Sequence, residues 1–201
     1  MKKTILFTIL SILILASCNS TKPVKTIENL KSGIKGEITA SAMYTAFAEK
    51  AKAEGHDTIA RLFDAASVSE GIHAVNLQKV LKSLGQQVDD YKPVFDVKTT
   101  EENIQIAIDV ETYEMKTMYP LFFNDAMKEK VGNAVRIYRW EFNSSLKHLG
   151  FFQRALDAIE NRNESTLPFH YAVCPECGNT YDYASLDNKC AFCGMPKDKF
   201  R

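Results

Sequence analysis

The sequence predicts a mainly α protein, a four-helix bundle followed by a small cysteine-rich β module. Apolar residues recur at helical spacing through four long stretches between residues 27 and 161. Four of the five cysteines lie in the last 28 residues. A chain of 201 residues is long enough for one such bundle and one small module. The 25 basic and 25 acidic residues balance, which argues against nucleic acid as a partner.

Residues 1–17 are predicted to be an export signal. MKK precedes an apolar run of 13 residues, which is too short for a membrane span of about 20 residues. The run ends in LASC, which resembles the lipobox of bacterial lipoproteins. The resemblance implies that Cys18 is lipidated and anchors the protein in a membrane, on the periplasmic or cell-surface side. A plain secretory signal with an incidental cysteine is the alternative.

The rest of the chain is expected to divide into four parts. A polar stretch after the signal is predicted to be a tether, and a polar segment before the cysteines is predicted to be a linker. The expected boundaries are 18–26 for the tether, 27–161 for the bundle, 162–172 for the linker and 173–201 for the cysteine module.

The first two helices form a predicted hairpin. The first runs from about Ile27 to Glu54 and ends at Gly55, because glycine is favoured after a helix terminus. Asp57 is expected to cap the second helix, which ends before Gly85. The inner face of this helix is predicted to include Leu62, Ala66, Glu70, His73, Leu77, Val80 and Leu84.

A longer connection and a capped third helix follow. Residues 86–98 lack a helical period and contain Pro93, so they are expected to cross over the bundle. Thr99 and Glu102 fit a capping box for a third helix that runs to about residue 130.

Pro120 lies inside the third helix and should kink or split it, because proline has no backbone N–H. A fourth helix is expected over residues 132–161. Two helical hairpins joined by a longer crossover resemble the ferritin-like four-helix bundle.

Six ionisable side chains fall on the inward faces of the four predicted helices. They are Glu37, Glu70, His73, Glu111, Glu114 and His148. Glu70 and His73 are three residues apart, as are Glu111 and Glu114, so each pair lies on one side of its helix. Buried charges are costly unless they are paired or bind metal. Any one of them alone is more often an exposed glutamate or a core histidine, but together they predict a dimetal site.

At these residues the chain resembles the rubrerythrin family, over nearly all of the sequence after the export signal. The matching motifs are Gly36-Glu37 with Tyr44, Glu70-Gly-Ile-His73-Ala, Glu111-Thr-Tyr-Glu114 with Met118-Tyr119-Pro120, and His148 with Phe151-Phe152 and Ala155-Leu156. The resemblance implies that two irons are bound by Glu37, Glu70, His73, Glu111, Glu114 and His148. It also implies that Tyr44 and Tyr119 hydrogen-bond the ligands or bound peroxide.

The fourth helix departs from the family pattern. The family has Glu-x-x-His, with a glutamate that bridges the irons, but here Ser145 stands three residues before His148. A serine is too short to bridge and removes a negative charge, so we expect weaker metal binding and resistance to oxidation to the ferric state. A water or hydroxide beside Ser145 is one compensation. Glu141 lies about 10 Å from His148 along the helix axis and, unless the helix is distorted, is expected to be a solvated surface residue.

The C-terminal module carries four candidate metal ligands, which are Cys174, Cys177, Cys190 and Cys193. They form two C-x-x-C pairs separated by twelve residues, a spacing that predicts one tetrahedral metal site. A zinc ribbon and a pair of disulfides are the alternatives. Gly178 and Gly194 follow the two pairs and permit tight turns whose N–H groups point at sulfur.

The residues around these cysteines resemble the rubredoxin-like module of rubrerythrins. The motifs that carry the resemblance are Cys177-Gly178-Asn-Thr-Tyr181-Asp182 and Cys193-Gly194-Met-Pro196-Lys197 with Phe200. The resemblance favours iron over zinc in this site. A small aromatic core is also expected here, made by Tyr171, Tyr181, Tyr183, Phe192 and Phe200.

The family resemblance implies an oxidoreductase that reduces hydrogen peroxide to water, with electrons passing from Fe(Cys)4 to the di-iron centre. Transfer between irons commonly crosses subunits in this family, so a homodimer is implied. The electron donor stays unknown. Two alternatives stay open: an impaired bundle site would leave a metal-binding or electron-carrying protein, and similar ligands would serve a ferroxidase that handles iron.

Overall fold

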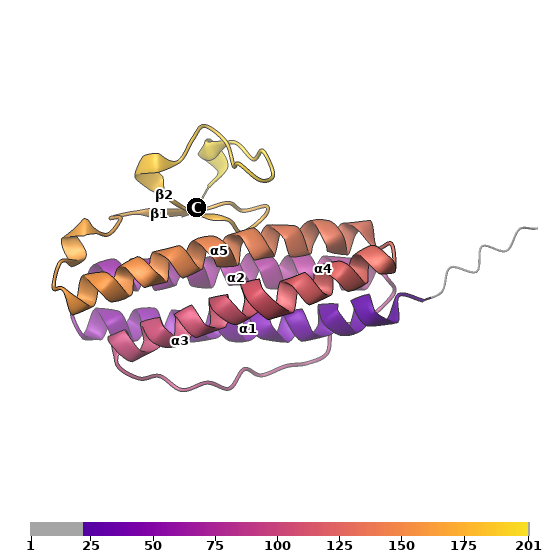
Figure 1. Ribbon diagram of the computed structural model, residues 1–201, viewed down its shortest axis with the longest axis horizontal. Coiled ribbons are helices and arrows are strands. Elements are labelled where there is room, and N and C mark those ends of the chain that lie inside the picture. Colours follow the sequence, from indigo (N-terminus) through magenta and orange to yellow (C-terminus); the bar gives the residue numbers. More distant parts are fainter. Residues whose placement is uncertain (1–21, 201) are drawn as a thin grey trace, which may run out of the picture.

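The computed structural model describes residues 22–200, so the predicted export signal and Cys18 lie outside the described residues. Five α-helices form the bundle (Figure 1). Their bounds are Val24–Ala53 for α1, Asp57–Ser83 for α2, Thr100–Tyr113 for α3, Tyr119–Lys128 for α4 and Gly132–Glu160 for α5. Within the described part of the chain, no helix combines the length and the apolar character needed to cross a membrane.

The first hairpin, α1 and α2, forms as expected, with two differences at its ends. Helix α1 begins at Val24, so it takes in residues that we expected in the tether. Gly55 has a φ of 88°, which explains the glycine at the turn. The expectation that Asp57 caps α2 is wrong, because His56 is the capping position and Asp57 lies in the first turn. Its negative charge is still favourable there, next to the unpaired N–H groups of the helix.

The second hairpin is reached by residues 86–99, which have no helix or strand and run along the bundle (Figure 1). The capping box is confirmed: the Thr99 hydroxyl accepts from the Glu102 N–H, and a Glu102 carboxylate oxygen accepts from the Thr99 N–H. The two hairpins and the long crossover give the ferritin-like connectivity that the sequence predicts.

Pro120 interrupts the third helical stretch, as expected, but without ending it. The five residues Glu114–Met118 are π-helical and join α3 to α4, and Pro120 lies in the first turn of α4. Since proline cannot donate the hydrogen bond that an α-helix requires, the preceding turn widens instead of breaking. The wide turn carries Glu114, one of the six predicted ligands.

The core consists of two apolar clusters separated by the polar middle of the bundle. One cluster is centred on aromatic rings that contact one another, among them Tyr44, Phe63 and Phe152. The other surrounds Leu30, Leu77, Phe122 and Tyr138 toward the α4 end. The buried ionisable side chains therefore lie between two dry layers that hold the helices in place.

The cysteine module contains a two-stranded antiparallel sheet, β1 (Tyr171–Val173) and β2 (Thr180–Asp182). Three short 3-10 turns accompany it, at Glu164–Thr166, Tyr183–Ser185 and Lys197–Lys199. The module packs over α2 and α5, on the side of the bundle opposite the crossover (Figure 1).

The aromatic core of the module is only partly as expected. Tyr181, Phe192 and Phe200 pack around the cysteines, and Trp140 of α5 joins them. The expectation is wrong for the other two tyrosines. Tyr171 packs edge-on against Phe151 of the bundle, and Tyr183 is 52% exposed. Docking onto α5 lets a bundle residue supply apolar surface that so small a module lacks.

Candidate metal centres

The six predicted bundle ligands converge in the middle of the bundle and are almost completely buried. None is more than 4% exposed. Two groups of three have ligand atoms within 4.8 Å of one another: Glu37 with Glu70 and His73, and Glu70 with Glu111 and His148. Glu70 belongs to both groups, so its two oxygens can serve two neighbouring metals.

Both histidines turn the same ring nitrogen toward Glu70. Nδ1 of His73 lies 2.6 Å from Glu70 Oε2, and Nδ1 of His148 lies 2.9 Å from Glu70 Oε1. The outer nitrogens face the cysteine module. Nε2 of His148 is 2.8 Å from the Thr180 hydroxyl, and Nε2 of His73 faces Gly178. The module thereby orients the imidazole rings from behind.

The two predicted tyrosines lie against carboxylates of the two groups. The Tyr44 hydroxyl donates to Glu111 Oε1 at 2.9 Å, and the Tyr119 hydroxyl donates to Glu37 Oε1. Burial and the nearby Glu111 raise the pKa of Tyr44 well above its usual value, so this hydroxyl stays protonated. Each tyrosine can therefore hold its carboxylate in place by donating a hydrogen bond.

Ser145 faces this centre, at the position predicted from its spacing to His148. Its hydroxyl donates to Glu114 Oε2 at 2.9 Å and is 3.1 Å from the Glu141 carbonyl oxygen. Glu114 is outside the two close groups, and Ser145 holds its carboxylate. Ser145 thus fixes one of the predicted ligands and supplies no carboxylate of its own.

The expectation that Glu141 is a solvated surface residue is wrong. Its side chain is 1% exposed and faces the bundle interior. It lies one turn before Ser145 on the same face of α5, and this four-residue spacing was the available signal. The axial distance between Glu141 and His148 gives only the separation of these two residues. The face of α5 on which Glu141 lies follows from its spacing to Ser145.

Burial and mutual repulsion set the protonation of the metal-free centre. Burial raises the pKa of Glu111 to about 7 and that of Glu141 to about 8, although nearby histidines oppose the shift. Burial also raises the pKa values of Glu37 and Glu114, and the other carboxylates add to this effect. For Glu70, the two histidines outweigh burial and lower its pKa. The metal-free site therefore keeps several protons that a bound cation would displace.

The donor set fits divalent metal ions. Two buried carboxylate oxygens, Glu37 Oε2 and Glu111 Oε2, have no hydrogen-bond partner among residues 22–200. Unpaired buried polar atoms are costly, and each of these belongs to a residue of the two groups. Carboxylates with one imidazole per group are suitable ligands for iron in a bundle core.

The four cysteines form a second, separate site. Cys174 Sγ lies 3.4 Å from Cys193 Sγ, and Cys177 Sγ lies 3.5 Å from Cys190 Sγ. In the described chain all four are free thiols, so the disulfide alternative is not what the structure shows. These separations approach the edge of about 3.8 Å in a tetrahedron of sulfurs around one metal.

The chain around the cysteines stabilises negative charge on sulfur. Gly178 and Gly194 have φ values of 76° and 79°, as the predicted tight turns require. Backbone N–H groups after the first cysteine of each pair point at sulfur. The Tyr181 hydroxyl lies 3.2 Å from Cys190 Sγ. The neighbouring thiols of Cys174 and Cys177 hold the pKa of Cys190 well below its usual range.

The comparisons agree with this geometry. A family model described as rubrerythrin matches residues 28–167. Rubrerythrin-2 of Clostridium acetobutylicum is 32% identical over 183 residues, which cover 90% of this chain and 98% of that protein. Nigerythrin of Nitratidesulfovibrio vulgaris is 32% identical over 183 residues, covering 87% and 85%. A solved structure of fully reduced, all-ferrous nigerythrin has a TM-score of 0.78 at 30% identity, covering 88% of this chain and 85% of that chain.

Proposed function

Because this chain belongs to the rubrerythrin family, we propose that it is an iron oxidoreductase that reduces hydrogen peroxide to water. Iron in the bundle would supply the two-electron reduction, and iron held by the cysteines would deliver electrons to it one at a time. The six bundle residues are the proposed ligands of two irons, and the four cysteines are the proposed ligands of the third.

The contact between the two sites is the observation that carries this proposal. Thr180 lies three residues after Cys177, and its hydroxyl contacts His148 at 2.8 Å. Gly178 follows Cys177 directly and lies against His73. Ser69 of α2 donates to the Gly178 carbonyl at 2.6 Å and fixes this contact. The chain next to a cysteine ligand therefore touches a histidine of each bundle group, which suits electron transfer between them.

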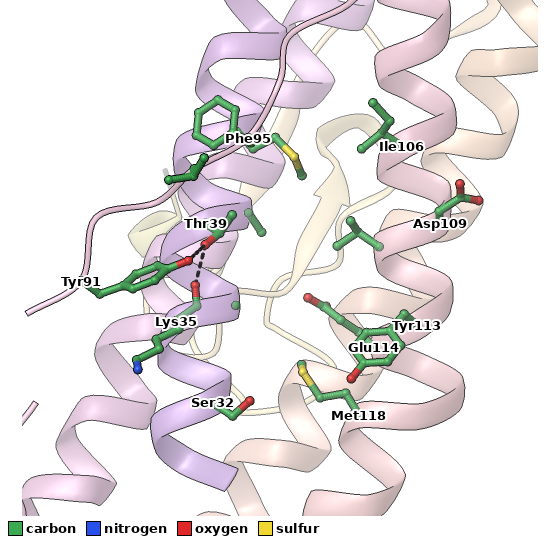
Figure 2. Close-up of a pocket in the computed structure, with 15 residues that line it drawn as sticks. Ser32, Lys35, Thr39, Tyr91, Phe95, Ile106, Asp109, Tyr113, Glu114 and Met118 are labelled. Carbon is green, nitrogen blue, oxygen red and sulfur yellow. Dashed lines mark hydrogen bonds between the residues drawn. The ribbon is translucent and has the colours of Figure 1, made fainter. Parts of the chain in front are cut away.

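A cavity on the opposite side of the bundle provides a route for a small substrate. It has a volume of about 670 Å³ and lies between α1, the crossover and α3 (Figure 2). Tyr113 of α3 and Glu114 of the π-helical segment extend toward it, and the Tyr91 hydroxyl is hydrogen-bonded to Thr39 at its other wall. Electrons would thus arrive from the module side and peroxide from the crossover side, past Glu114.

Hydroxyl groups around the centre would orient the substrate oxygens by hydrogen bonding. Tyr44 and Tyr119 keep hydroxyl protons beside Glu111 and Glu37. Glu114 lies at the end of the cavity. Cleavage of the O–O bond consumes two electrons and two protons and yields two waters.

Metal content and peroxide consumption test the proposal together. The purified full chain should bind about three irons, and the reduced protein should consume peroxide. Cys174→Ser should lose the cysteine-bound iron and slow electron delivery about 100-fold while the bundle irons remain. If the wild-type protein with three irons consumed peroxide no faster than this variant, peroxide reduction would be excluded.

Ser145 favours a second candidate. A bundle with fewer carboxylates than the family pattern would suit binding or oxidation of ferrous iron without peroxide turnover. About one iron per chain would support a metal-binding or electron-carrying protein. Oxygen-dependent iron oxidation that exceeds peroxide reduction would support a ferroxidase.

The proposed location and partners rest on the sequence. We propose an exported lipoprotein anchored through Cys18, a homodimer, and an electron donor outside the cytoplasm. Mass spectrometry of the mature N-terminus should find acylated Cys18, and Cys18→Ala should release the protein from the membrane fraction. Light scattering of the detergent-solubilised protein would show whether it is a dimer.

A further inference from the structure

We propose that Glu141 is a seventh ligand of the bundle and binds the metal held by Glu37, Glu70 and His73, in place of the carboxylate that position 145 lacks. The inference rests on the part of the proposed function that gives the bundle two irons, and it does not depend on peroxide as the substrate. It changes the expected character of the site, because one metal would gain a carboxylate and the other would not.

The surroundings of Glu141 carry this inference. The side chain is 1% exposed, and neither carboxylate oxygen has a hydrogen-bond partner anywhere in residues 22–200. A buried carboxylate of this kind is costly, because it has lost its hydration and gained no donor. A glutamate with a purely structural role in the core would be paired with a donor. An apolar residue of similar size would lose less free energy on burial. A cation is the partner that a carboxylate in this position lacks.

The position of Glu141 along the bundle selects the metal. Glu141 lies on the Glu37 and His73 side of Ser145, because α5 runs from Glu141 through Ser145 to His148. The charge of Glu141 acts on Glu37 and on His73, and both Glu70 and His73 act on Glu141. Among the six predicted ligands, those that interact with the charge of Glu141 are therefore the three members of the first group.

The ligation would be terminal instead of bridging. A glutamate at position 145 would lie level with both groups, whereas Glu141 is one turn farther from His148. Glu141 is outside the two groups whose ligand atoms lie within 4.8 Å of one another, so its side chain must swing toward the first group to bind. Its oxygens are free to do so, since no hydrogen bond in the described chain holds them.

The charge of the centre would then be close to the family pattern. Four glutamates balance two ferrous ions, and a fifth leaves one negative charge. Glu141 restores this charge, but places it on one metal. The metal near His148, held by the group of Glu70, Glu111 and His148, would gain no carboxylate from α5, and we expect its affinity to be the weaker of the two.

Anaerobic titration of ferrous iron tests this asymmetry in the full chain, with the cysteine site already filled. The wild-type bundle should bind two irons in two steps of unequal affinity. Glu141→Gln should weaken the tighter step by about tenfold or more and leave the weaker step within about twofold. Ser145→Glu should mainly strengthen the weaker step. In the double variant that carries both Glu141→Gln and Ser145→Glu, the new glutamate should restore the affinity of the tighter step.

Tyr138→Phe is the matched control. Tyr138 is buried on the same helix, one turn before Glu141, and within residues 22–200 its hydroxyl also has no partner. Its removal should leave both iron-binding steps unchanged. The metal-free Glu141→Gln protein should unfold at the same or a higher temperature than the wild type, because an unpaired acid has been replaced by an amide.

The outcomes separate the inference from the proposed function. Unchanged affinities in Glu141→Gln, with the metal-free protein still folded, would overturn the inference. A folded Glu141→Gln protein that loses both steps equally would also contradict it, since Glu141 would then act on the whole centre. A wild-type protein that binds two bundle irons in the predicted steps but does not consume peroxide would keep the inference and reject peroxide reduction.

Discussion

The two candidate metal centres of this protein are built in opposite ways. The cysteine site takes its four ligands from 20 consecutive residues, and tight turns aim backbone N–H groups at the sulfurs. The bundle site takes its ligands from four helical stretches between residues 37 and 148, and one carboxylate oxygen each of Glu37 and Glu111 has no donor among the described residues. A local site can be read from spacing alone. A site assembled by packing depends on which residues the helices bring to the same depth.

The largest expected effect is on the bundle site, because Glu70 is shared by both groups. Glu70→Gln should reduce iron from about three to about one per chain and abolish activity that depends on the bundle irons. The visible spectrum of the cysteine-bound iron should be unchanged. Glu49→Gln, on the exposed face of α1, is the control. If Glu70→Gln retained three irons, the two centres would not share this ligand.

The second prediction compares the two turns of the cysteine site. In Gly178→Ala the new Cβ would lie 2.4 Å from His73 Nε2, at a φ of 76°. In Gly194→Ala the φ is 79°, but apart from residue 194 and its two chain neighbours no atom of residues 22–200 lies within 4 Å of the new Cβ. Gly178→Ala should destabilise the module by about 2 kcal/mol or more, and Gly194→Ala by about 1 kcal/mol.

The two glycine variants should also differ in the rate of electron transfer from the cysteine-bound iron to the bundle. Gly178→Ala should also push the module away from the histidines, so reoxidation of its iron by the bundle should slow by more than in Gly194→Ala. Stopped-flow absorbance of the cysteine-bound iron measures this rate. Equal rates in the two variants would mean that the contact of Gly178 with His73 does not serve electron transfer.

The third prediction concerns pH in the metal-free protein. Buried carboxyl groups with raised pKa values make the folded state bind more protons than the unfolded state, so the free energy of unfolding falls as pH rises. Burial raises the pKa of Glu111 to about 7. For His73, burial lowers the pKa, but Glu70 outweighs it and raises the pKa to about 9. The lowered pKa of Glu70 makes the free energy of unfolding depend on pH only below about 4.5, the usual pKa of the group, so it has no effect at higher pH.

The midpoint of thermal unfolding of the metal-free protein should therefore fall by several degrees between about pH 5 and about pH 9. Iron displaces these protons, so the loaded protein should show a smaller fall. Calorimetry of both forms measures the difference. An equal pH dependence in the two forms would contradict the proposed ligand set.

The smallest expected effect is on the cysteine site, through Lys147. Its ammonium group lies 3.5 Å from the centre of the Tyr181 ring, whose hydroxyl contacts Cys190. Burial lowers the pKa of Lys147 to about 8, against the attraction of Cys190 and Cys177. Lys147→Met removes a positive charge near the sulfurs, so the reduction potential of the cysteine-bound iron should fall by tens of millivolts. Lys189→Met, an exposed lysine beside Cys190 in sequence, is the control.

The sequence predicted most of the fold, because its helices and their ends depend on local chemistry. The α5 bounds, the Thr99 and Glu102 capping box and the interruption at Pro120 all followed from residues within a few turns. The expected cap, Asp57, is off by one position, because His56 takes the capping position without a side-chain hydrogen bond. The convergence of the six predicted bundle residues also followed from their spacing.

By itself the sequence determined the four helical stretches, the face on which each candidate ligand lies, and the four-thiol site. Only the tertiary structure decided how deep each residue lies and which segments meet. It buried Glu141 without a partner among residues 22–200, placed Gly178 against His73, and joined Thr180 to His148. Periodicity assigns a residue to one side of a helix, but the rotation of that helix and the docking of a distant segment depend on packing across the whole molecule.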